Sequence, residues 1–441
     1  MINIKYLLFK IITIKFIIII IIKYFQDQLE LNKIFLNYQK ELNISFSVKI
    51  KRKIRIGIYT LCLKNGGRAR IASMLINHLY KFKLFNIILY TQKLEENNEY
   101  SYSKKIKRFI IDTNNVTKIF KNKIDILIFH LNSYKRTKLF NYYNNIKVIY
   151  YMHNSIFGFI HSNYTYFKIL FKEYTKSKYL ISLIPFENDF LFKELGINSI
   201  LMNNFITYNY KRIIPSNLSS KIILMIGRAN DKNKRFDLGI MSMEYIIQVI
   251  QDCILKIISQ LDNINDLINL IDNLNLRNKI KVEGLESGSQ LFFKNESLHF
   301  FPSISESFGL VLAETKMYGI PNILMGINYI SLVKNGTIII YDDTPESLAK
   351  EGIIILLNNR FREYLGKESK KSMKKYNNEA LAKKWINLIL YINYNDSYYF
   401  KFKRQNIKIT DKESLFILNK QNHNLKMRQI NNFQNFTFLI K

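Results

Sequence analysis

The pattern of apolar and polar positions has a strand-turn-helix order early in the chain. The stretch Arg55-Ile-Gly-Ile-Tyr-Thr reads as a buried strand, the loop LCLKNGGRAR follows it, and a helical run extends from about Ile71 to Phe82. A strand, a glycine turn and a helix in this order are typical of the opening of a Rossmann-type domain.

Short apolar runs then recur, separated by polar or helical segments. They cover residues 86–90, 125–130 (DILIFH), 147–153 (KVIYYMH), 179–184 and 200–202. This alternation predicts a parallel sheet covered by helices. Residues 207–220 are more polar, contain Pro215 and lack a sustained period, which is typical of a domain linker.

The same pattern restarts after this linker, with residues 221–227 (KIILMIG) as a new first strand. Later strands are predicted at 255–258, 279–282, 298–302, 321–325 and 337–341, and helices at 263–274, 310–318, 346–357 and 379–392. We therefore expect an α/β protein with two Rossmann-like, doubly wound domains that face a central cleft. A ligand is expected between them, at the carboxyl ends of the strands.

The predicted organisation has two domains with appendages. A length of 441 residues favours two cores over one. The predicted parts are a hydrophobic N-terminal segment at 1–24, an N-terminal domain at 50–210, a C-terminal domain at 220–396 and a basic tail at 397–441.

The N-terminal segment is a marginal candidate for a membrane anchor. Residues 6–22 (YLLFKIITIKFIIIIII) are about long enough to span a bilayer, but Lys10 and Lys15 interrupt them. Insertion of the thirteen Leu, Ile and Phe residues gains roughly 0.3 to 0.6 kcal/mol each, and their sum nearly cancels the cost of about 2.5 to 3.5 kcal/mol for each of the two lysines. An anchor, a secretory signal and a chance product of composition stay open. The basic cluster at 49–55 favours a location in the cytoplasm or at the cytoplasmic face of a membrane.

Composition narrows the class of protein. Hydrophobic residues make up 48% of the chain, so a folded protein is expected. The formal net charge of +32 is inflated by a Lys excess that is typical of AT-rich genomes. It still favours anionic partners such as nucleotide phosphates, acidic glycans, phospholipid headgroups or nucleic acid. Cys62 and Cys253 are the only cysteines, which mildly favours a reducing compartment.

The stretch FPSISESFGLVLAETKMYGIP, residues 301–321, carries two carboxylates eight positions apart. Glu306 follows a predicted strand, and Glu314 lies inside the next helix. This spacing suits hydrogen bonds to both ends of a nucleotide sugar, with Glu306 near the sugar and Glu314 near the ribose. The alternative for Glu314 is a solvated helix position, but its neighbours are mostly apolar and a buried carboxylate needs a partner.

The turn between these carboxylates is suited to phosphate binding. Backbone amides at a helix N-terminus are unpaired, and the helix dipole favours an anion there. The amides in question belong to Ser307, Phe308 and Gly309. Gly309 would also let a diphosphate approach the backbone closely.

A second stretch, MIGRANDKNKRFDLGI at residues 225–240, again reads as strand, polar turn and helix. Arg228 and Lys234 are expected to project toward the same crevice. Two cations there would balance the charge that builds on a nucleoside diphosphate leaving group. The alternative is a solvated basic start of a helix, although cations oppose the helix dipole at that end.

Together these features resemble glycosyltransferase family 4, the group 1 glycosyltransferases with the GT-B fold. The resemblance rests on strand-Gly-Arg with a nearby Lys, followed by Glu-x7-Glu in PSxxESFGLxxAE, and it covers residues 54–393. It implies retaining transfer of a sugar from a nucleotide diphosphate donor. Arg228 and Lys234 match the family's donor-phosphate residues, and Glu306 and Glu314 match its two motif glutamates.

The resemblance also assigns residues of the N-terminal domain. Gly66 and Gly67 match the family's glycine-rich first loop against the donor diphosphate and the acceptor; a plain turn is the alternative. His153, in YYMHNS, matches the histidine that faces the sugar, and a core or capping histidine is the alternative. Three further polar residues stand at strand ends or turns, with structural roles favoured: His130, Asn132 and Asn204.

The chain departs from the family pattern at two points. Lys234 follows Arg228 by six residues where many members have five, and Thr315 replaces the common Ala after the second glutamate. Neither change removes a charged group. No Asp-x-Asp stands in a setting for a donor metal, since Asp342-Asp343 lies on a different loop, so no metal and no cofactor beyond the nucleotide sugar are expected.

The predicted function is transfer of a sugar to a hydroxyl of a glycan or a lipid-linked acceptor. A sugar epimerase or a phosphorylase is an alternative on the same fold, although a phosphorylase would require a pyridoxal-binding lysine that the sequence does not reveal. A non-catalytic basic binding or scaffolding protein is the alternative from another class. It would leave the ordered pair of motifs to coincidence, and no nucleic-acid-binding signature is present, so nucleic acid is not expected as a partner.

Overall fold

The computed structural model describes residues 52–394 except 65, 95–98, 112–122, 131–145, 157, 159–173, 176, 208–212, 262–263, 286–290, 326–334 and 341. The predicted hydrophobic segment, the basic tail and Asn132 lie outside the described residues. Within the described part of the chain, no helix has the length and apolarity needed to cross a bilayer.

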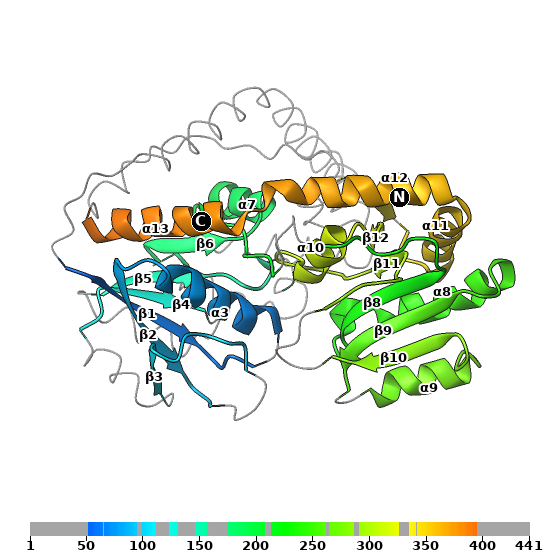
Figure 1. Ribbon diagram of the computed structural model, residues 1–441, viewed down its shortest axis with the longest axis horizontal. Helices are drawn as coiled ribbons and strands as arrows, with labels where there is room; N and C mark the ends of the chain where they lie inside the picture. The colour runs from blue at the N-terminus through cyan, green and yellow to red at the C-terminus, as the bar shows by residue number, and fades with distance from the viewer. Residues whose placement is uncertain are drawn as a thin grey trace, which may run out of the picture.

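The N-terminal domain is built on a sheet of 7 parallel strands in the order β3-β2-β1-β4-β5-β6-β7 (Figure 1). The strands are β1 (Ile54–Thr60), β2 (Phe85–Thr91), β3 (Lys107–Ile110), β4 (Ile126–Phe129), β5 (Lys147–Tyr151), β6 (Tyr179–Ser182) and β7 (Ile200–Leu201). Helix α3 (Gly66–Tyr80) follows β1, and α7 (Pro185–Leu195) follows β6. The central strand β4 is apolar and buried throughout because both faces of a parallel sheet are covered.

The C-terminal domain has a sheet of 6 parallel strands in the order β10-β9-β8-β11-β12-β13. The strands are β8 (Ile222–Arg228), β9 (Ile254–Gln260), β10 (Ile280–Gly284), β11 (Leu298–Phe301), β12 (Asn322–Met325) and β13 (Thr337–Ile340). The helices are α8 (Phe236–Val249), α9 (Asn265–Asn273), α10 (Leu310–Met317) and α11 (Pro345–Leu357). The predicted α/β class with two doubly wound sheets is therefore confirmed.

Local sequence signals set the helix ends in this domain. Helix α11 has Pro345 in its first turn, and the Thr344 hydroxyl accepts a hydrogen bond from the amide of Ser347 at 3.2 Å. The next helix, α12 (Asn359–Ser372), begins after Asn358, whose side chain accepts from the amide of Phe361 at 2.9 Å. These caps explain why α11 and α12 are separate helices joined at one residue.

The last helix, α13 (Asn378–Tyr394), returns to the N-terminal domain after a short 3-10 turn at Met373–Lys375. Figure 1 shows α12 lying along the C-terminal domain and α13 along the N-terminal domain. Trp385 of α13 is fully buried, with its ring centroid 5.4 Å from that of Tyr151 in β5. The sequence pattern predicts residues 379–392 as part of the C-terminal domain. The structure differs because the apolar face of α13 completes the N-terminal core.

The two chain crossings between the domains lie beside each other. The backbone amide of Ile206, in the first crossing, donates to Asn378 Oδ1 at 2.9 Å, and Asn378 Nδ2 donates back to the carbonyl of Ile206 at 2.6 Å. The apolar core also continues between the domains, since buried residues of α3, α10 and α13 form one cluster. The domains are therefore joined by packing as well as by the chain.

The strand order places the ligand region in each domain. The order reverses between β1 and β4 in the first sheet and between β8 and β11 in the second. In open parallel sheets, ligands bind outside the carboxyl ends of the strands at this switch point. The segments that leave β8 and β11 are the two that carry the motifs with Arg228, Lys234, Glu306 and Glu314.

Candidate functional site

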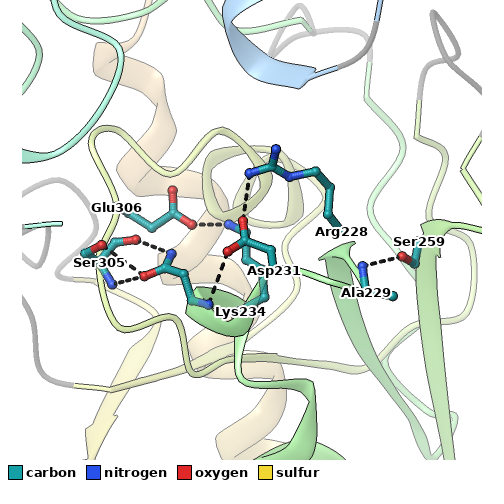
Figure 2. A network of polar contacts seen from close by, with 8 residues as sticks. Arg228, Ala229, Asp231, Lys234, Ser259, Ser305 and Glu306 are labelled. Atoms are coloured by element: carbon teal, nitrogen blue, oxygen red, sulfur yellow. Dashed lines mark hydrogen bonds and ion pairs between the residues drawn. The ribbon is translucent and has the colours of Figure 1, made fainter. Parts of the chain in front are cut away.

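The turn after β8 is folded tightly by its own side chains. Arg228 ends the strand, and a 3-10 turn at Lys232–Lys234 follows. The Asp231 carboxylate accepts from Arg228 Nη2 at 2.8 Å and from the amide of Asn233 at 3.1 Å (Figure 2). The side chain of Arg228 is 65% exposed, so it is accessible to a ligand at the strand end.

Arg235 separates the 3-10 turn from α8. Its φ of 51° lies in the left-handed region, which a non-glycine residue adopts only where the surroundings hold it. Here the Arg235 guanidinium donates from Nη1 to both carboxylate oxygens of Asp343, each at 2.8 Å. Lys234 therefore does not belong to the first turn of α8, which begins at Phe236, and the alternative of a solvated basic helix start does not describe it.

Lys234 faces Glu306 across the two motifs. Glu306 lies on the loop between β11 and α10, and its carboxylate forms an ion pair with Lys234 Nζ (Figure 2). The two side chains are only 18% and 15% exposed. Lys234 Nζ also lies 5.6 Å from the centroid of the Phe301 ring. A cation and a carboxylate are thus held together at the carboxyl ends of neighbouring strands.

Asn233 clamps the same two segments together. Its Nδ2 donates to the carbonyl of Ser305 at 2.7 Å, and its Oδ1 accepts from the amide and the hydroxyl of Ser305, both at 2.9 Å. The backbone adds a bond from the amide of Ile304 to the carbonyl of Asn233 at 2.9 Å. These bonds fix the register between the turn with Lys234 and the loop with Glu306.

Helix α10 begins immediately after this loop. Gly309 stands at its N-cap with a φ of 73°, a conformation that favours glycine. Phe308 is 1% exposed, and its ring packs edge-on against Tyr376 with centroids 6.0 Å apart. The side chain of Phe308 therefore belongs to the core, and only its backbone amide is available to an anion at the helix N-terminus.

Glu314 of α10 is buried and contacts the N-terminal domain. Its Oε1 lies 2.7 Å from Nη1 of Arg70, on α3, and accepts from the Thr207 hydroxyl at 3.1 Å. Burial raises the pKa of Glu314, and the positive charge of Arg70 opposes that rise. The prediction that this carboxylate needs a partner is met, but the partner in this structure is a residue that the motif does not contain.

The glycine pair of the first loop opens α3. Gly66 has a φ of 82°, and Gly67 approaches the other domain so closely that a Cβ there would lie 2.8 Å from Cδ1 of Leu310. Leu310 is the first residue of α10. The N-terminal ends of α3 and α10 therefore meet at this point, and the missing side chain of Gly67 permits the approach.

His153 follows β5 and is paired with His130 after β4. His153 Nε2 lies 2.7 Å from His130 Nδ1, and the two rings are stacked. Burial lowers the pKa of His130 to about 3 and that of His153 well below its ordinary value, with the charge of Arg68 adding to both effects. The pair is therefore neutral near pH 7, with one ring donating to the other.

Two contacts hold the loop that carries His153. The Ser307 hydroxyl donates to the backbone carbonyl of His153 at 2.6 Å, which joins the C-terminal motif to this loop. Glu187 of α7 accepts from the amide of Ile156 at 3.0 Å. Burial raises the pKa of Glu187 to about 8, so this carboxyl group is protonated near neutral pH.

The structure thus gathers most of the predicted residues. Lys234 and Glu306 are in contact, Ser307 contacts the loop of His153, and Gly67 approaches the start of α10. Asn204 has a structural contact instead: its buried side chain accepts a hydrogen bond from the Tyr151 hydroxyl at 2.7 Å.

Three contributing residues were missed by the sequence analysis: Arg70, Asn233 and Thr207. Asn233 sits inside the quoted motif and its position between Arg228 and Lys234 was a usable signal. The contacts of Arg70 and Thr207 depend on how the two domains meet. Within the described residues, no group of three or more His, Cys, Asp or Glu side chains is placed to hold a metal ion.

Comparison with known proteins finds one family match, which covers the linker and most of the C-terminal domain. Residues 208–372 match the family described as Glycosyl transferases group 1. The resemblance to the group 1 glycosyltransferases is thereby confirmed. The matched segment contains Arg228, Lys234 and both motif glutamates. No curated protein sequence matches the chain at a significant level.

Solved glycosyltransferase structures share the GT-B fold of the whole described chain. Sucrose-phosphate synthase (tll1590) from Thermosynechococcus elongatus is 16% identical, with a TM-score of 0.65, and the match covers 77% of this chain and 99% of that one. Anabaena Alr3699/HepE, in complex with UDP and glucose, is 12% identical, with a TM-score of 0.61 and coverages of 76% and 99%. A mutant of S. aureus TarM, in a complex that contains UDP, is 14% identical, with a TM-score of 0.59 and the same coverages of 76% and 99%. At these identities the likeness concerns the fold.

Helix α10 also contains a lysine with an unusual environment. Lys316 is fully buried, and its Nζ donates to the carbonyl of Asn335 and, at 3.0 Å, to the Thr337 hydroxyl. Burial lowers the pKa of Lys316 to about 7, and the charge of Lys375 contributes. This position is therefore costly for a cation near neutral pH.

We predict that Lys316 makes the stability of the protein rise with pH above neutrality. Between a folded-state pKa of about 7 and the ordinary value of 10.5, the unfolded chain binds the proton and the folded chain does not. The free energy of unfolding then increases with pH, by at most about 1.4 kcal/mol per pH unit. Urea denaturation of Lys316→Met between pH 6 and pH 9 should show this increase reduced relative to wild type.

Lys350→Met, on the exposed face of α11, is the matched control and should keep the wild-type profile. If Lys316→Met and the wild type have parallel profiles over this range, Lys316 does not titrate as its burial implies.

Proposed function

We propose that this protein is a retaining glycosyltransferase of family 4 that moves a sugar from a nucleotide diphosphate donor to a hydroxyl of a glycan or a lipid-linked acceptor. The observation that carries the proposal is the placement of Lys234 and Glu306, in contact, at the carboxyl ends of β8 and β11. These two strands flank the switch point where parallel α/β sheets bind nucleotides. The family match over residues 208–372 also supports a glycosyltransferase function.

The donor diphosphate is assigned to the region between the β8 turn and the start of α10. Arg228 and Lys234 supply positive charge, and the free amides around Gly309 supply hydrogen-bond donors at a helix N-terminus. In this assignment the phosphate becomes a second anionic partner of Lys234. Glu306 then accepts a hydrogen bond from a hydroxyl of the donor sugar. The HepE structure with UDP and glucose and the TarM structure with UDP concern relatives in fold, and they support a nucleotide donor.

Sugar transfer in this account depends on stabilising the leaving group. As the glycosidic bond breaks, negative charge develops on the diphosphate, and Arg228 and Lys234 offset it in place of a metal ion. The acceptor hydroxyl lies along the N-terminal domain and attacks the same face of an oxocarbenium-like sugar. Its proton passes to the departing phosphate oxygen. His153 is neutral and faces the sugar as a hydrogen-bonding group.

Donor binding is testable by thermal shift in EDTA. The purified protein is heated with UDP, GDP, ADP and their sugar conjugates, and one nucleotide class should raise the melting temperature. A ligand at a hundred times its Kd adds about 2.7 kcal/mol of stability, which is a shift of a few degrees. Lys234→Ala should lose the shift, measured from its own ligand-free melting temperature.

Lys232→Ala is the matched control, since Lys232 belongs to the same turn but is exposed, and it should keep the shift. Well-folded wild-type protein that responds to no nucleotide would contradict donor binding and favour a non-catalytic scaffolding role.

We further propose a location in the cytoplasm or at the cytoplasmic face of a membrane, based on the apolar residues 6–22 and the basic cluster at 49–55. The full chain should float with vesicles that contain anionic lipid, even in high salt, whereas the chain without residues 1–24 should float only at low salt. Full-length protein that stays unbound at both salt concentrations would contradict membrane association.

A further inference from the structure

The ion pair between Arg70 and Glu314 joins the two domains beside the candidate donor site. Arg70 lies in the second turn of α3, and its Nη1 is 2.7 Å from Glu314 Oε1. The side chains are 12% and 1% exposed, so both charges are largely withdrawn from water. Breaking such a pair is strongly destabilising because it leaves a buried charge without compensation.

The hydrogen bonds to Glu314 are unevenly divided between its oxygens. Oε1 receives both Arg70 and the Thr207 hydroxyl, the latter at 3.1 Å. Oε2 is buried and has no hydrogen-bond partner among the described residues, and the same holds for Nε of Arg70. A buried carboxylate oxygen without a donor is unfavourable, and more so when it is charged. Oε2 is therefore suited to accept a hydrogen bond from a ligand.

The position of Glu314 along α10 identifies the part of the ligand. The helix rises about 1.5 Å per residue, so Glu314 lies about 7.5 Å along the axis from Gly309 at the N-terminus. A diphosphate held at that N-terminus places the ribose of the nucleotide at this depth. The ribose has two neighbouring hydroxyl groups, and either can donate the hydrogen bond that Oε2 lacks.

We infer that Arg70 is a positioning residue that directs Oε2 of Glu314 toward the ribose hydroxyls, so that the preference for a ribonucleotide over a 2′-deoxyribonucleotide depends on a residue of the opposite domain. This inference rests on the proposed function. By occupying Oε1, Arg70 fixes the rotation of the carboxylate, and its positive charge opposes the rise in the pKa of Glu314 that burial causes. Without Arg70, Oε1 keeps only the Thr207 hydroxyl as a partner, and the carboxylate is free to rotate away from the ribose.

The close contact at Gly67 explains how α3 reaches Glu314. Gly67 and Arg70 are three positions apart on α3, and residues at this spacing share a helix face. Gly67 touches the start of α10 at Leu310, and Arg70 reaches Glu314 one turn further along α10. The glycine contact and the ion pair therefore form one interface between the two helices.

The test is the affinity ratio for ribo- and deoxyribonucleotides. Titration calorimetry compares UDP with 2′-deoxy-UDP, and GDP with 2′-deoxy-GDP, on the full-length chain. The wild type should bind the ribose form at least about tenfold more tightly, as expected when a buried polar group loses its partner. Arg70→Met should lower this ratio to below about threefold.

Arg70→Lys, which keeps the charge without the guanidinium fork, should give an intermediate ratio and serves as the second variant if Arg70→Met does not fold. Arg277→Met is the matched control, because Arg277 pairs with Asp272 at an exposed site, and it should keep the wild-type ratio. Circular dichroism confirms the fold of each variant.

The outcomes separate the inference from the proposed function. Binding of UDP or GDP with an unchanged ratio in the folded Arg70 variants overturns the role of Arg70 and leaves donor binding intact. A wild type that binds the ribonucleotide and the 2′-deoxyribonucleotide equally well also overturns the role of Arg70. If the wild type binds neither UDP nor GDP, the proposed donor site fails, and the inference fails with it.

Discussion

The clamp between the turn after β8 and the loop after β11 is the constraint on which the site depends. Asn233 supplies three hydrogen bonds to Ser305, and the Lys234–Glu306 ion pair closes the same junction. The sheet alone fixes only where the strands end. Lys234 and Glu306 lie beyond those ends, so they meet only because the turn and the loop that carry them are also held in place. With the clamp formed, a cation and a carboxylate are held together on the segment that leads into α10, an arrangement that suits the proposed diphosphate bonded to a sugar.

The charged side chains of the candidate site are paired with one another. Lys234 is held by Glu306, Arg228 by Asp231 and Glu314 by Arg70. Pairing keeps partly buried charges from destabilising the ligand-free protein. If the proposed donor binds here, it exchanges partners within existing pairs and needs little rearrangement. The cross-domain pair links this exchange to the contact between the domains.

The sequence predicted the fold well because the signals are local. The apolar runs that became β1, β8 and β11 need only their own residues to be recognised, and the glycines at 66 and 309 mark turns with positive φ. Strand β3 was missed, since it is a short edge strand with mostly exposed residues. Helix α12 was missed as well, because its sequence is rich in polar residues.

The site was predictable only up to the residues within the two motifs. Phe308 turned out to be a core side chain, which the motif alone does not distinguish from a ligand contact. Arg70 and the domain membership of α13 depend on how two separate sheets pack, and no periodicity within either segment encodes that. Contacts between the domains therefore could not be predicted from the sequence, and only the three-dimensional structure reveals them.

The central claim is retaining sugar transfer without a metal at this site. The most direct measurement is time-resolved proton NMR of the sugar released in EDTA from an α-linked nucleotide sugar, such as UDP-glucose or GDP-mannose, with water as the acceptor. If transfer is retaining, the α-anomer appears first, before mutarotation, and release is lost in Lys234→Ala. Initial appearance of the β-anomer, or turnover that requires added metal, would contradict it.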